Sequence, residues 1–344
     1  MVYARSFIVM GFVMGSKKRI VKWIILGVLG VILAVIATVI SVNEIYAHKI
    51  PHRFASAREG RELLLSNTEY YENYSQNDID CRMKKSGATI DELLEVSADE
   101  VKGFNIFEKY FIDARIAGMV RKLEKNGYQL PEIDEITFVN TKMAVEFGAS
   151  GYTHGTEIYL NSSIVAIYSA LSFIPEFAGS ADELICHELF HCLTRCNPEF
   201  RKQAYSLINF TVTDTEFDFP PSVRDLILSN PDVEHHDSYA TFIIDGQEID
   251  CFVAFASDTL YADNPGCEQI TVLIPIDGTD IYYTQEQASN FDEVFGTNTS
   301  YVIDPEECLA DNFKFAMLYG TEGKDKQGYP NPEIIEGIID IVKE

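Results

Sequence analysis

The chain has 344 residues, of which 47% are hydrophobic and 23% are charged, a balance typical of a folded globular protein. Its formal net charge is -26, and the first 47 residues contain only five of its 27 Lys and Arg and one of its 53 acidic residues. The remainder therefore has 22 basic and 52 acidic side chains. Because so acidic a surface repels phosphate backbones, we expect no nucleic-acid partner.

An apolar stretch near the N-terminus predicts a membrane segment. Residues Trp23–Val42 contain no charge and are long enough to cross a bilayer, and basic residues at 17–19 and 22 precede them. The basic flank predicts a cytoplasmic N-terminus over 1–19, a single-pass anchor over 20–42 and a cell-membrane protein whose bulk is extracytoplasmic. A cleaved signal peptide, which would give a secreted protein, is the alternative.

The next segments predict a stalk followed by helices. Residues 43–66 are polar and basic and predict a stalk that becomes helical near its end. The segments Thr89–Val96 and Phe107–Asn126 predict helices, the second with apolar residues at helical spacing and Gly127 at its end. We expect one catalytic domain over 67–344.

Three short runs then predict strands, namely Glu135–Asn140, Ala144–Phe147 and Thr156–Leu160. They suggest a small antiparallel pair, whose edge either binds an extended peptide by strand addition or is an ordinary sheet edge. His154 lies in a turn between them, where it is either solvated or in contact with a substrate.

The segment Ala181–Arg195, ADELICHELFHCLTR, is the chain's most informative motif. Ser180 and Glu183 predict a capping box at the start of its helix. His187 and His191 are four residues apart and so share one helix face, with Glu188 beside them. Two imidazoles and a carboxylate in this H-E-x-x-H pattern predict two zinc ligands and a base that takes a proton from water.

The region 211–303 predicts an inserted β-rich lobe. Asp245-Gly246 and Asp277-Gly278 each separate two β-rich runs and predict hairpins. Asp304 and Pro305 then predict the start of a helix, DPEECLADNFKFAMLYG, and a last helix follows Pro332.

A catalytic zinc site needs a third protein ligand. The metzincin pattern would require Gly at position 194 and His at position 197, where this chain has Thr194 and Asn197. The other arrangement uses a Glu on a downstream helix with an Asp four residues later, and Glu307 and Asp311 fit it. Glu307 is then the third ligand, and Asp311 accepts a hydrogen bond from the far ring nitrogen of a liganding His.

With His187, Glu188, His191, Glu307 and Asp311, the chain resembles the gluzincin-type zinc metallopeptidases of the thermolysin-like clan. The resemblance implies an α+β, zincin-like fold with an edge strand beside the motif helix, a Zn²⁺ cofactor and hydrolysis of peptide or protein substrates with Glu188 as general base. The long segment between His191 and Glu307 departs from the compact members of that clan.

The sequence leaves several candidates for the donor that stabilises the oxyanion. His236 is our first candidate for this catalytic role, with His235, Tyr239 and Tyr301 as alternatives. For each of these residues, the alternative interpretation is an ordinary loop or packing residue. Two other functions remain possible: a membrane-tethered binding module with a vestigial or structural zinc, and a zinc amidase acting on cell-wall peptides. The oligomeric state is not predicted.

The seven cysteines predict mostly buried thiols or one disulfide, with Cys251–Cys267 as one possible pair. Cys192 and Cys196 lie four residues apart and have a metal pair as their less favoured alternative.

Overall fold

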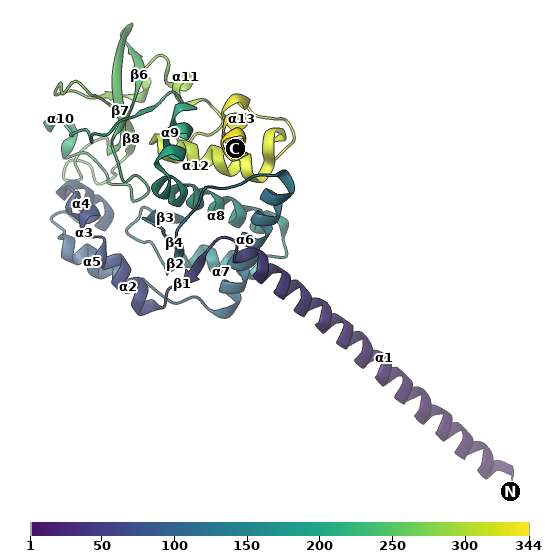
Figure 1. Ribbon diagram of the computed structural model, residues 1–344. Coiled ribbons are helices and arrows are strands. Elements are labelled where there is room, and N and C mark those ends of the chain that lie inside the picture. The colour runs from purple at the N-terminus through teal and green to yellow at the C-terminus, as the bar shows by residue number, and fades with distance from the viewer. Residues whose placement is uncertain (1, 344) are drawn as a thin grey trace.

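The computed structural model describes the backbone of residues 2–343 and side chains from residue 21 onward, so the basic side chains at 17–19 lie outside the described residues. The fold is mixed α+β, as predicted. A long helix, α1 (Val2–Ala47), projects away from a rounded body that holds all the other elements (Figure 1). Within α1, residues Val21–Ala47 have a mean hydropathy of 2.9 and are long and apolar enough to cross a membrane.

The predicted stalk is instead part of the body. Asn43 and Ala47, at the end of α1, are buried, and the amide of Asn43 bonds to Tyr110 and Arg121. The strand β1 (His52–Phe54) follows at once and pairs with the body's first sheet. A three-residue strand carries too little pattern to be recognised in the sequence.

The first sheet has four strands in the order β1-β2-β4-β3. Strands β1, β2 (Ile136–Thr141) and β4 (Glu157–Asn161) are parallel, and β3 (Gly151–His154) runs antiparallel to β4 at the edge. The predicted antiparallel pair therefore exists, but its outer strand is β3. The predicted strand Ala144–Phe147 is a turn, in which Phe147 has a φ of 49°.

The segment between β1 and β2 is helical, as are the residues after β4. The first group comprises α2 (Ala57–Ser66), α3 (Thr68–Glu72), α4 (Gln76–Met83), α5 (Ile90–Asp99) and α6 (Ile106–Asn126). The second comprises α7 (Ser162–Ala170), α8 (Pro175–Cys196) and α9 (Pro198–Ser206). Helix α8 begins at Pro175, earlier than predicted, because Pro suits the first helical position; Ser180 lies inside the helix and donates to the carbonyl of Glu176.

The second sheet is antiparallel and ordered β5-β6-β7-β8-β9. Its strands are β5 (Thr211–Val212), β6 (Ser238–Ile244), β7 (Gln247–Ser257), β8 (Gln269–Pro275) and β9 (Tyr283–Thr284). The β6–β7 hairpin turns at Asp245 and Gly246, both with positive φ, as predicted. Strands β8 and β9 also pair, through a longer connection than a two-residue turn.

The remaining helices complete the body. They are α10 (Pro221–Arg224), η1 (Gln285–Gln287), α11 (Phe291–Phe295), α12 (Pro305–Tyr319), η2 (Gly320–Glu322) and α13 (Pro332–Ile341). Figure 1 shows α8 inside the body, with the first sheet on one side and α12 on the other. The main core joins these layers, with the rings of Phe190 (α8) and Phe313 (α12) 5.3 Å apart. This packing fixes the two helices that carry the predicted metal ligands.

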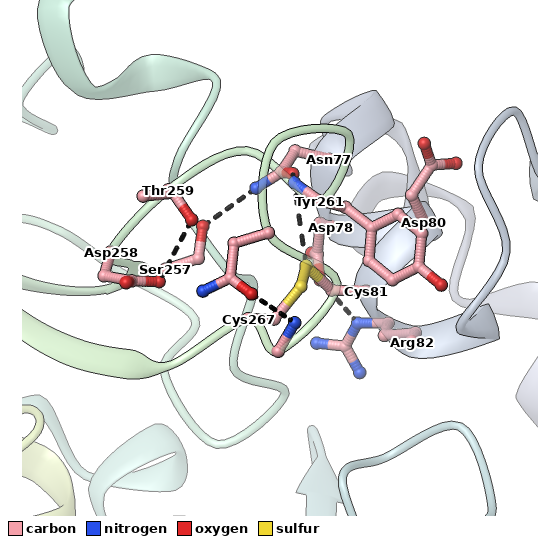
Figure 2. The surroundings of a disulfide bond; sticks show 12 residues. Asn77, Asp78, Asp80, Cys81, Arg82, Ser257, Asp258, Thr259, Tyr261 and Cys267 are labelled. Carbon is pink, nitrogen blue, oxygen red and sulfur yellow. Dashed lines mark hydrogen bonds and ion pairs between the residues drawn. A yellow bond between two sulfur atoms is a disulfide. The ribbon is translucent and has the colours of Figure 1, made fainter.

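A disulfide ties α4 to the second sheet (Figure 2). It joins Cys81 to Cys267, in the β7–β8 connection, across a sequence separation of 186. The considered pair Cys251–Cys267 is therefore wrong, and Cys251 is a free, buried thiol in β7. Cys192 and Cys196 are free as well.

Candidate metal centre

Helix α8 presents two imidazoles to α12. His187 and His191 lie one turn apart on α8, with ring centroids separated by 4.9 Å. The His191 side chain is fully buried, and 12% of the His187 side chain is exposed. Two adjacent buried imidazoles need partners, because burial of an unpaired polar group costs free energy.

Helix α12 supplies the third group. Glu307 Oε2 lies 3.0 Å from His187 Nε2 and 3.6 Å from His191 Nε2. These spacings bracket the separation of about 3.3 Å expected between two tetrahedral zinc ligands. The other carboxylate oxygen, Oε1, accepts hydrogen bonds from Asn230 Nδ2 (2.7 Å) and from the Tyr301 hydroxyl (3.1 Å). Glu307 thus offers one oxygen to the histidines while two donors hold the other.

A carboxylate on α12 supports the far nitrogen of each imidazole. His187 Nδ1 lies 3.0 Å from Asp311 Oδ1, and His191 Nδ1 lies 3.1 Å from Glu306 Oε1. Glu306 also accepts from the hydroxyls of Thr194 (2.6 Å) and Tyr205 (2.7 Å). A hydrogen bond from Nδ1 to a carboxylate fixes the tautomer that directs the Nε2 lone pair at a metal.

Glu188 lies beside this group without a protein partner for one of its oxygens. The residue is buried, and among the described residues its Oε2 makes no hydrogen bond. Burial and the neighbouring charge of Asp232 raise the pKa of Glu188 to about 8. A carboxyl with a pKa near neutrality is suited to proton transfer.

Gly151 of β3 covers the Glu188 carboxylate. A Cβ atom at position 151 would lie 2.5 Å from Glu188 Oε1, so any residue other than Gly would have to displace the carboxylate from its present position. The backbone of the edge strand therefore passes directly over the candidate base.

The buried groups fit a metal ion. His187, His191 and Glu307 each offer a ligand atom, and these atoms lie within 4.8 Å of one another. His191 Nε2 is buried and has no hydrogen-bond partner among the described residues, as expected for a nitrogen whose partner is a cation. A set of two imidazoles and one carboxylate is the donor set of many catalytic zinc sites.

The pKa values of the metal-free groups follow from the same contacts. Burial favours a neutral His187, but its hydrogen bonds to Asp311 and Glu307 outweigh burial and raise its pKa to about 10. Burial likewise disfavours ionised Glu307, yet the hydrogen bond from His187 and the charge of His191 lower the pKa of Glu307 to about 2. The carboxylate is therefore ionised, and in the metal-free protein the His187 ring takes up a proton.

The structure does not bring His236 to this group. Its ring packs against Phe219, with centroids 4.8 Å apart, and against Phe252 of the second sheet. Burial lowers the pKa of His236 to about 4, so it is a neutral packing residue. The prediction of a catalytic His236 is wrong, because the aromatic side chains around it could not be foreseen from a loop sequence.

Of the other candidate oxyanion donors, one lies at the metal group and two do not. His235 pairs with Glu216 on the surface, and Tyr239 lies in β6. Tyr301 is the one alternative donor placed at the metal group, through its bond to Glu307. His154 is buried against Tyr70, with ring centroids 4.6 Å apart, so a solvated His154 is wrong.

Sequence reasoning missed three residues around the metal group. Glu306 directly precedes the predicted ligand and was not among the candidates, while Asn230 and Asp232 lie in a loop without periodicity. Asp232 is buried, and its Oδ1 lies 4.0 Å from His191 Nε2. Two features of the sequence could have pointed to these residues: the adjacent acids in PEECLAD for Glu306, and the N-P-D turn for Asn230 and Asp232.

Comparison of the chain with protein-family models, curated proteins and solved structures found no match.

Proposed function

We propose that the protein is a zinc-dependent peptidase of zincin-like architecture, anchored in the membrane by α1, with its body outside the cytoplasm. The observation that carries the proposal is the convergence of His187, His191 and Glu307 beside the unpartnered carboxylate of Glu188. The adjacent edge strand β3 and the apolar helix α1 are consistent with it.

The chain's own residues have defined roles in this proposal. A zinc ion bound by His187, His191 and Glu307 would polarise the substrate carbonyl and acidify water. Glu188 would take the proton from the attacking water and return it to the leaving amine. Tyr301 takes the place of His236 as candidate oxyanion donor, because its hydroxyl already lies at Glu307.

Asp232 favours one rival, a tethered binding module with a structural metal. Structural zinc sites are closed by four protein ligands, whereas catalytic sites keep a position open. Asp232 Oδ1 is 4.0 Å from His191 Nε2, near enough for a modest shift to make it a fourth ligand. Binding of a hydroxamate, which needs an open position, would favour the peptidase.

Metal analysis and two variants test the proposal. We expect the full chain, purified in detergent and reconstituted with zinc, to hold one zinc per chain and to cleave a peptide library. Glu188→Gln should keep the zinc and lose at least 100-fold of the activity, because proton transfer contributes roughly 10²–10⁴-fold. Glu307→Gln should lose zinc affinity instead. Failure of the wild-type chain to bind zinc would reject the proposal.

A further inference from the structure

The outer edge of β3 is occupied at one end and free at the other. Thr153 N–H donates to Asp232 Oδ1 (2.7 Å), and Gly155 N–H donates to Glu234 Oε1 (2.8 Å). Ladder bonds to β4 alternate along an antiparallel pair, so Gly151, two residues before Thr153, also directs its backbone groups outward. A peptide added to this edge can pair at Gly151 but not at Thr153.

The loop 231–234, which covers this end of β3, is held in place by Arg195 from the last turn of α8. Its guanidinium donates to the carbonyls of Pro231 and Asp232, both at 3.1 Å, and also pairs with Glu234 (2.9 Å). The same side chain donates to the Gly155 carbonyl at 3.1 Å. The largely buried Arg195 side chain thus links the loop 231–234 to the end of β3 through several hydrogen bonds.

The free end opens into a cavity of about 310 Å³. Residues 148–152, which include the start of β3, form one wall, and the loop 229–232 forms another. Phe147, Phe255 and Tyr301 make the lining partly aromatic. A bound peptide can therefore extend away from Glu188 on this side, into a cavity whose lining is polar as well as aromatic, since Arg82 and Glu146 also form part of it.

The closed end lies at the metal group itself. One ligand atom each of Glu188, His191 and Asp232 lie within 4.8 Å of one another, and Glu188 Oε2 is buried without a partner. The amino nitrogen and the carbonyl carbon of one residue are about 2.5 Å apart. A carboxylate this near the metal group can hold the amino group of the residue whose carbonyl is attacked.

The charge at the closed end selects which peptide terminus fits there. Asp232 faces His191 and Arg195, but also the carboxylates of Glu307 and Glu188. The Asp232 carboxylate, which lies beside the closed end, would accept hydrogen bonds from an α-ammonium group, whereas an α-carboxylate has no proton to donate and would meet a like charge there.

We propose that the site binds peptides by their free amino terminus, with Asp232 as the acceptor of the α-ammonium group, and removes the amino-terminal residue. This inference rests on the proposed peptidase function and adds its substrate class. Water attacks the first peptide bond, the bond to the second residue's nitrogen breaks, and the proton from water passes to that leaving nitrogen.

Binding of two matched probes tests this recognition without turnover. Leucine hydroxamate and N-acetyl-leucine hydroxamate differ only in the charge and size of the amino group. We expect the zinc-loaded full chain to bind the free form at least tenfold more tightly by titration calorimetry. Asp232→Asn, whose Oδ1 still accepts from Thr153, should reduce the preference to within threefold. Glu176→Gln, at the exposed start of α8, is the control for the loss of one carboxylate and should leave the preference unchanged.

The outcomes separate the two proposals. Equal affinity for both probes would leave the open zinc site standing and reject amino-terminal recognition. A gain in affinity for both probes in Asp232→Asn would show that Asp232 is a fourth metal ligand, which also rejects it. If neither probe binds the zinc-loaded chain, the peptidase function fails and the inference fails with it. Zinc content and thermal unfolding of each variant show that it is folded.

Discussion

The two sides of the candidate metal centre are built differently. On the helix side, α8 and α12 supply both histidines, Glu307 and the two supporting carboxylates, Glu306 and Asp311. On the loop side, residues 229–232 supply Asn230 and Asp232 from a segment with no regular structure. The helix side is fixed by core packing, so the loop side must be held from elsewhere.

Helix α4 holds the loop side through Ser229. Asp78 accepts a hydrogen bond from Ser229 N–H (2.8 Å), and Arg82 donates to the Ser229 carbonyl. Asp78 and Arg82 are buried and pair with each other at 2.7 Å. The disulfide at Cys81 lies between them in the sequence (Figure 2). A loop can thus be positioned as firmly as a helix when buried charged side chains bond to its backbone.

Removing the disulfide should give the largest effect, and it should lower the stability of the fold without weakening the helix side's hold on zinc. The paired change Cys81→Ser and Cys267→Ser opens a loop of 186 residues, whose closure is worth about 5 kcal/mol in the chain-entropy treatment. We expect denaturant unfolding to show a loss of that order, with Cys196→Ser as the control. Zinc affinity should stay within threefold, and a large fall would mean that the two sides are not independent.

The two supporting carboxylates should differ in their effect on the helix side. Changes at such residues cost roughly 10–100-fold in metal affinity. We expect Glu306→Gln to lie at the upper end, because Glu306 is buried and accepts from His191, Thr194 and Tyr205. Asp311→Asn should lie at the lower end, because the Asp311 side chain is slightly more exposed than that of Glu306 (10% against 6%) and Thr299 and Lys314 can still hold the substituted residue in place.

Competition with a chelator measures both affinities. The exposed Glu176, at the start of α8, supplies the control Glu176→Gln, which should leave the zinc affinity unchanged. If Asp311→Asn is the more damaging change, His187 rather than His191 is the ligand that depends on its support.

The smallest expected effect is the pH dependence that the protonation of His187 gives to stability and to zinc binding. The pKa of His187 is about 10 in the metal-free fold and 6.5 in its ordinary state, so the folded protein keeps this proton between those values. This contribution to stability is complete below pH 6.5 and is lost as the pH rises through 10. Zinc needs the neutral ring, so binding at pH 8 should release at least one proton and strengthen as the pH rises.

Calorimetry in buffers of different ionisation enthalpy counts the released protons. His187→Gln, which removes the titrating ligand, should bind zinc weakly and release fewer of them. Release of less than half a proton by the wild type would contradict the charged His187.

The sequence predicted the helix side well because its information is local. His187, Glu188 and His191 follow from a helical repeat, and Glu307 and Asp311 lie one turn apart on α12. Glu306 was missed because spacing alone cannot show which of two neighbouring acids faces which histidine. Each residue there belongs to a regular element, so its direction follows from its number.

The loop side was missed because its information is not local. Asp232 is held at the metal group by contacts of its loop with Thr153, with Arg195 and with helix α4, all of which are distant in the sequence. The same reason explains the errors at His236, whose aromatic neighbours come from other segments, and at Cys267, whose partner lies 186 residues away. Contacts between residues so far apart in the chain produce no periodic pattern in the sequence.

The continuity of α1 with the body has a mechanical consequence. One face of the last turns of the helix, at Asn43 and Ala47, is buried where α1 packs against α6, and Asn43 bonds to both Tyr110 and Arg121. The helix is therefore continuous from the apolar segment into the folded body. A bilayer that grips residues 21–42 would therefore also set the height and tilt of the cleft above it. The cleft would then keep a fixed distance and orientation relative to the membrane. Peptides would have to reach it at that one height above the membrane surface.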